Sequence, residues 1–121
     1  ALVADSLFAD CNTVMKTLWR LRNAPMPFFY SAVGMFRLMY GYDLRSERPV
    51  DEIIDFYPRP LLIIHCKADD HVPVEQFYRL QRAAPWAETW LLEQCRHAEI
   101  YEFVPDEYNQ KVVGFFDAAL K

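Results

Sequence analysis

A group of ionisable and reactive side chains follows an apolar run near the middle of the chain. After Leu61–Ile64 come His65, Cys66, Lys67, Asp69, Asp70 and His71, and His97 lies further along. A carboxylate that holds an imidazole fixes its tautomer and orientation and stabilises its cation, while the imidazole moves the proton. These residue types therefore indicate acid–base chemistry, provided that the fold brings a carboxylate and an imidazole together.

Three apolar stretches predict the strands that would position these groups. They are Ala1–Ala4, Leu61–Ile64 and Ala87–Leu92. The middle run has no alternation of polar and apolar residues, which is typical of a strand covered on both faces. Apolar residues at helical spacing predict the helices. They cover Leu7–Arg22, Phe28–Tyr40, a short turn from Pro49, Pro73–Ala84, and the stretch from Pro105 that carries Tyr108, Val112, Phe115, Phe116 and Ala119.

The order of strands and helices predicts an α/β fold with three parallel strands flanked by helices, in one domain over residues 1–121. Parallel strands joined by crossovers place their carboxyl ends at one edge of the sheet. The loops that follow Ile64 and Leu92 should therefore lie side by side. This topology predicts that Asp69 and His97 meet at that edge.

Composition excludes several classes of protein. The chain has 121 residues, of which 53% are hydrophobic, with a net charge of -4; this excludes a disordered tail and argues against nucleic acid as a partner. No apolar stretch reaches the roughly 20 residues that a membrane helix needs. The cysteines Cys11, Cys66 and Cys95 are odd in number and widely spaced, so we predict no disulfide framework and a cytoplasmic location.

The segment PRPLLIIHCKADDHVP resembles the acid-bearing strand and loop of the α/β-hydrolase superfamily, in its dienelactone-hydrolase and prolyl-oligopeptidase-like branches. The resemblance implies that Asp69 is the catalytic acid, and CRHAEIYEFVPDEYNQKVVGFFDAAL resembles the family's histidine loop, which implies that His97 is the catalytic base. It covers nearly the whole chain but only the C-terminal half of a family domain. The three strands would then be the last three of the family sheet, and no cofactor or metal is implied.

The chain departs from the family pattern at two places. Cys66 stands where the family usually has Gly. No Ser or Cys is bracketed by glycines as the nucleophile motif G-x-S-x-G requires, and the chain opens at Ala1 directly into an apolar run. We therefore expect the nucleophile to precede Ala1.

Each candidate residue also has a purely structural interpretation. Asp69 would make a good cap for the helix at Pro73, and a slip of one residue in the matching would make Asp70 the acid. His97 alone would be an ordinary surface imidazole. His65 is interpreted as a structural residue hydrogen-bonded to a neighbouring loop, and His71 as exposed.

Two further interpretations compete for other side chains. Metal-ligand types gather in one region, namely Cys66, Asp69, His71, Cys95 and His97, but their spacing matches no specific zinc motif. The aromatic residues of Phe28–Tyr40 would line a substrate pocket or, as the preferred interpretation, form ordinary core.

Two functional hypotheses follow. In the first, the chain supplies the acid and the histidine of a Ser-His-Asp hydrolase acting on a small-molecule ester, thioester or amide, and is inactive without its nucleophile. In the second, it is a non-catalytic interaction module. An unpaired edge of the first strand predicts a homodimer or pairing with the missing N-terminal half.

Overall fold

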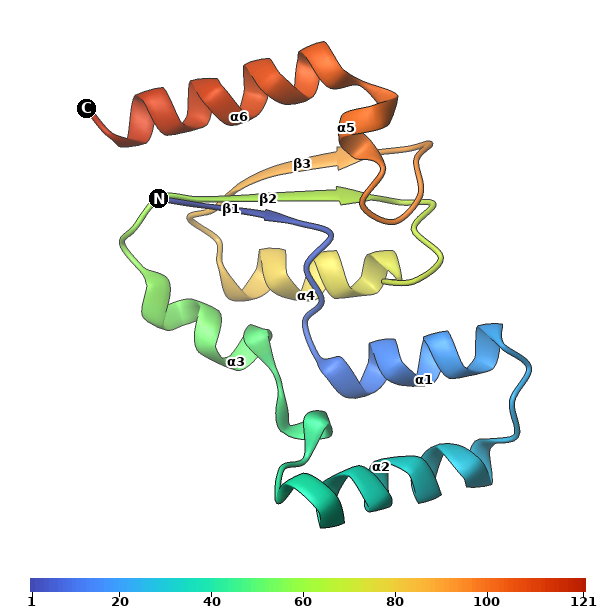
Figure 1. Ribbon diagram of the computed structural model, residues 1–121. Helices are drawn as coiled ribbons and strands as arrows, with labels where there is room; N and C mark the ends of the chain where they lie inside the picture. The colour runs from blue at the N-terminus through green and yellow to red at the C-terminus, as the bar shows by residue number, and fades with distance from the viewer.

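The computed structural model describes residues 1–121 and contains one parallel sheet with helices on both faces (Figure 1). The strands are β1 (Leu2–Asp5), β2 (Leu61–Cys66) and β3 (Glu88–Leu92), in the spatial order β1-β2-β3. Both pairs are parallel, which confirms the predicted fold class. The carboxyl ends of all three strands consequently lie at one edge.

The predicted helices occur in the predicted order, and one short helix, α5, was not predicted. They are α1 (Cys11–Leu21), α2 (Met26–Tyr40), α3 (Pro49–Glu52), α4 (Val74–Ala83), α5 (Ile100–Phe103) and α6 (Pro105–Ala119), with single 3-10 turns at Leu44–Ser46 and Ile53–Phe56. The first helix starts four residues later than its predicted start at Leu7. The reason is Asp10, whose side chain accepts the Thr13 N–H at 2.7 Å and so fixes the helix start as an N-cap.

Strand β2 is the centre of the molecule, and all six of its residues are buried. Its side chains alternate between two apolar clusters. Leu61 and Ile63 pack with Phe77 and Leu80 of α4 on one face. Leu62 and Ile64 pack on the other face, where Phe115 of α6 lies. Figure 1 shows α4 and α6 on opposite sides of the sheet, which explains why the sequence of this strand has no polar alternation.

A buried polar network joins the start of α1 to α4. The Gln76 side-chain oxygen accepts the backbone N–H groups of Ala9 and Asp10, each at 3.0 Å. Arg79 forms an ion pair with Asp10. Burial raises the pKa of Asp10, but hydrogen bonds from Arg79 and Thr13 outweigh it and lower the pKa below its ordinary value. The α1 end that lies nearest the sheet is therefore fixed by hydrogen bonds.

Helix α2 does not form the ordinary core that was predicted for it. Only Phe29 and Val33 are buried, and they face α1, where Trp19 meets Phe29 edge to face. The outer face carries six exposed apolar side chains: Phe28, Tyr30, Met35, Leu38, Met39 and Tyr40. The prediction was wrong because α2 lies far from the sheet (Figure 1) and packs against one neighbouring helix.

The prediction that the cysteines stay unpaired is also wrong. Cys66 and Cys95 form a disulfide with their Cα atoms 5.6 Å apart, whereas Cys11 is free. Wide spacing in sequence suggested no pairing, but Cys66 ends β2 and Cys95 follows the neighbouring parallel strand β3, so the two residues meet at one edge. The argument for a reducing compartment therefore loses its basis. None of the helices has the length and apolar character needed to cross a bilayer.

Candidate active site

The loop after β2 is organised by one buried carboxylate. The Asp69 side chain is fully buried. Its Oδ1 accepts the backbone N–H groups of His71 at 2.9 Å and Val72 at 2.8 Å. Helix α4 starts after Pro73 without any side-chain cap. The capping interpretation of Asp69 is therefore wrong, because this carboxylate holds the loop before the helix.

The second oxygen of the same carboxylate reaches the loop after β3. Asp69 Oδ2 lies 2.8 Å from Nδ1 of His97. Because Nδ1 of the imidazole lies against a carboxylate, it carries the proton, which leaves Nε2 of the neutral ring as an acceptor. The structure thus brings together the two residues that the sequence paired, and it is Asp69, not Asp70, that contacts His97.

His97 borders a surface cavity of about 390 Å³ at the carboxyl edge of the sheet. Its side chain remains 36% exposed, so the ring contacts both the buried acid and the cavity. Ser6 and His71 line the same cavity, and Leu18 lies on its apolar side. The imidazole of His97 is therefore accessible to a molecule bound in this cavity.

His65 is buried on the α4 side of the sheet, as its structural interpretation predicted. Its Nε2 lies 3.0 Å from the Val72 carbonyl oxygen, and its ring stacks on Phe77 with centroids 5.8 Å apart. Burial lowers the pKa of His65, against the opposing effects of Asp69 and the Val72 carbonyl. A neutral His65 thus fixes the loop that carries the acid.

His71 is exposed, as predicted, but it lies beside the candidate base. Its ring centroid is 5.1 Å from that of His97, and its Nδ1 is 2.8 Å from Asp70 Oδ1. Nothing in the sequence indicates this contact, because it depends on the turn that Asp69 imposes. Two imidazoles and two carboxylates therefore gather at this edge.

Ser6 directly follows β1 and was not predicted to be a site residue. Its hydroxyl accepts the Ala98 N–H at 3.3 Å and donates to Asp5 Oδ1 at 2.9 Å. Its φ of 54° lies in the left-handed region, which is uncommon for a residue other than Gly. The sequence does contain a signal for this residue. Ser6 follows a predicted parallel strand, and the carboxyl end of that strand lies beside the loop that carries His97.

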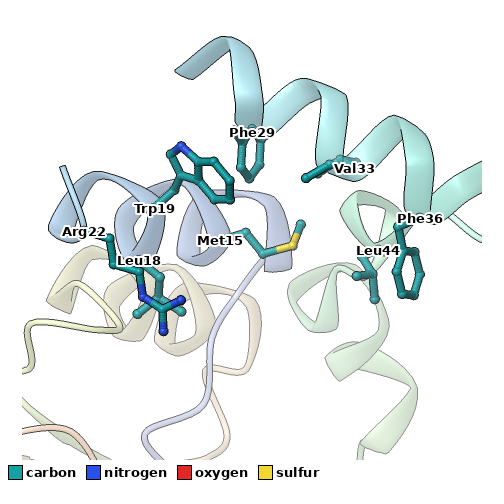
Figure 2. Close-up of a pocket in the computed structure, with 9 residues that line it drawn as sticks. Met15, Leu18, Trp19, Arg22, Phe29, Val33, Phe36 and Leu44 are labelled. Carbon is teal, nitrogen blue, oxygen red and sulfur yellow. The ribbon is translucent and has the colours of Figure 1, made fainter. Parts of the chain in front are cut away.

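A second, more apolar cavity lies between α1 and α2 (Figure 2). Its volume is about 300 Å³, and eight of its nine lining residues are hydrophobic. Figure 2 shows Met15 and Trp19 of α1 facing Phe29 and Val33 of α2. Leu18 lines this cavity and also the cavity at His97, so the two are neighbours.

The metal-ligand types identified in the sequence do not form one set. Cys66 and Cys95 are bonded to each other and cannot act as thiolate ligands in that state. Donor atoms of Asp69, Asp70 and His71 lie within 4.8 Å of one another. Asp69 in that group already contacts His97 and two backbone N–H groups.

The chain is similar to known proteins over most of its length. The chain matches none of the protein-family models. It is 31% identical to the uncharacterized protein YqkD of Bacillus subtilis over 123 residues, which span 94% of the chain and 40% of that protein. Its structure is similar to the Pyrococcus furiosus esterase Pf2001, with a TM-score of 0.68 and 22% identity over 98% of this chain and 45% of that one.

A meta-cleavage product hydrolase from Pseudomonas fluorescens IP01 is also similar, with a TM-score of 0.50 and 33% identity. That match spans 64% of this chain and 27% of the hydrolase. The chain thus spans less than half of the length of each of these three proteins. Together with the three parallel strands, these similarities give the chain a partial α/β-hydrolase fold.

We predict that His65 makes the protein less stable in mild acid. The pKa of the buried ring is lowered in the folded state, so as pH falls below about 6.5 the unfolded chain binds a proton that the folded chain does not. The free energy of unfolding should therefore decrease from about pH 7.5 to about pH 5.5, as measured by urea denaturation.

His65→Gln should remove part of that decrease, because Gln does not titrate and can still donate to Val72. The matched control is His71→Gln, at an exposed imidazole, which should retain the decrease. An equal pH dependence in wild type and His65→Gln would contradict the prediction.

Proposed function

We propose that this chain supplies the acid and the base of a hydrolase that cleaves an ester, thioester or amide. The observation that carries the proposal is the hydrogen bond from His97 Nδ1 to the buried Asp69 Oδ2. A buried carboxylate holds the imidazole in one tautomer and stabilises its cation. The similarity to an esterase and to a meta-cleavage product hydrolase supports a hydrolase in general.

In the proposed mechanism, Nε2 of His97 takes a proton from a nucleophile and later donates it to the leaving group. Asp69 stays ionised and keeps the imidazole in place. No G-x-S-x-G motif occurs in the chain, and the chain spans 40% of the relative it matches. We therefore place the nucleophile in sequence that precedes Ala1 in a longer protein.

We further propose that the substrate carries an apolar acyl group. The cavity between α1 and α2 is lined almost entirely by apolar side chains and adjoins the His97 cavity at Leu18. A volume of about 300 Å³ is at the lower end for small-molecule pockets. Figure 2 shows Phe29 and Val33 of α2 pointing into this cavity. Residues of α2 thus line a pocket, which was the second interpretation of Phe28–Tyr40 from the sequence.

The alternative is a non-catalytic interaction module, and one observation favours it. Strand β1 pairs with β2 on one side and has no neighbour on the other, and its Leu2 is 45% exposed. A free edge of this kind presents unpaired N–H and C=O groups that can add a strand from another chain. In that case the partner would be a second copy or an N-terminal half.

Replacing Asp69 by Asn should nearly abolish hydrolysis while the fold is retained. The Asn oxygen can still accept the N–H groups of His71 and Val72, but it no longer stabilises the His97 cation. We expect kcat on a p-nitrophenyl ester to fall on the order of 10⁴-fold, in a protein that includes the sequence before Ala1.

The matched control for that experiment is Asp70→Asn, at an exposed carboxylate next in sequence, which should keep kcat near the wild-type value. The 121-residue chain alone should show no turnover above buffer. Turnover by the chain alone that disappears in His97→Ala would place the nucleophile inside it.

Val33→Phe should reduce activity on long acyl esters and leave acetate esters unaffected. The larger ring fills part of the apolar cavity, and each methylene that loses its place costs about 0.8 kcal/mol, or about fourfold in kcat/KM. Met35→Phe, on the exposed side of the same helix, is the control. Equal losses on all acyl lengths would count against the pocket.

Light scattering on the chain alone tests the edge of β1. Because that edge and the outer face of α2 are uncovered, we expect dimers at micromolar concentration. Leu2→Lys should shift the population to monomer. A folded wild-type monomer across this range would rule out the interaction module as a self-associating one.

A further inference from the structure

The Cys66–Cys95 disulfide connects the two loops that carry the candidate acid and base. Cys66 is the last residue of β2 and lies three residues before Asp69, whose N–H donates to the Cys66 carbonyl at 3.2 Å. Cys95 lies in the loop after β3, with only Arg96 between it and His97. The disulfide and the Asp69–His97 hydrogen bond therefore join the same two loops at points a few residues apart.

The loop that carries His97 has few other attachments before the ring. No backbone N–H from Glu93 to His97 donates a hydrogen bond to another backbone group. Glu93 forms an ion pair with Lys67, but both side chains are exposed, and exposed pairs contribute little. The next fixed points are Ala98, held by Ser6 at 3.3 Å, and the fully buried Ile100. The disulfide is thus the strong attachment on the strand side of His97.

We propose that Cys66 and Cys95 are positioning residues, whose disulfide keeps the His97 imidazole within hydrogen-bond distance of Asp69. The catalytic meaning of this positioning rests on the proposed function, but the geometric effect does not. A displacement of about 1 Å in a reacting group can lower its rate on the order of a hundredfold. A covalent bond two residues from the imidazole limits such displacement.

The first test measures the imidazole proton directly in the chain labelled with ¹⁵N. In the disulfide form, the His97 Nδ1–H proton should give a low-field resonance that exchanges slowly with water. In Cys66→Ala/Cys95→Ala the resonance should broaden or exchange at least about tenfold faster, because the loop leaves Asp69 more often. Cys11→Ala, at the free cysteine, is the matched control and should leave the resonance unchanged.

Reduction gives the same comparison without substitution. A small dithiol transfers two electrons and two protons to the disulfide, which becomes two thiols while the dithiol closes to a cyclic disulfide. A thiol assay should find one free thiol before treatment and three after it, in line with one free cysteine among three. Removal of the dithiol in air should restore both the disulfide and the His97 resonance.

The second test uses activity in the protein that includes the sequence before Ala1. The double variant should lose kcat by up to about a hundredfold, the loss expected when a reacting group is displaced by about 1 Å, with KM changed far less. If the disulfide served only general stability, its removal would lower Tm and would leave kcat unchanged at temperatures below Tm.

Four results would overturn the proposal. The first is an unchanged His97 Nδ1–H resonance in the double variant, and the second is three free thiols in the untreated protein. The third is complete loss of the folded circular dichroism spectrum in both the variant and the reduced chain, because the bridge would then act on the whole fold. The fourth is an unchanged kcat. Absence of any hydrolysis, with the resonance responding as expected, would contradict the proposed function instead.

Discussion

The parallel pairing of β2 with β3 is the constraint on which the rest of the structure depends. Leu62 pairs with Glu88 and Cys66 with Leu92, so both strands end at the same edge. Burial of β2 on both faces stabilises this pairing, since its side chains belong to two separate apolar clusters. Loops that are distant in sequence then start from neighbouring points. The acid, the base and the disulfide all depend on that proximity.

Asp69 has a structural role in its loop and, in the proposed mechanism, a chemical role as well. A carboxylate buried from water is costly unless its oxygens are paired. Here Oδ1 accepts two backbone N–H groups, and Oδ2 contacts His97. The buried His65 supports the same loop through Val72. The carboxylate is therefore held in place by the fold itself, as the proposed acid–base mechanism requires.

The part of the molecule formed by α1 and α2 differs from the sheet and its flanking helices. Helix α1 is fixed at its start by Gln76 and Arg79, whereas α2 contacts α1 through one narrow face and leaves most of its apolar side chains uncovered. The apolar cavity lies between these helices. Binding surfaces are commonly built outside the rigid core, while the buried sheet positions the proposed acid and base.

The sequence by itself determined the parallel α/β class, because an unbroken apolar strand such as Leu61–Ile64 needs cover on both faces. It also predicted that the loops of Asp69 and His97 share an edge, because strand order decides which loops lie side by side. Only the tertiary structure decided which carboxylate reaches the ring, and that Cys66 bonds to Cys95. It also showed that α2 is largely uncovered and that Ser6 holds Ala98. These features depend on distances between residues far apart in the chain, which periodicity and composition do not record.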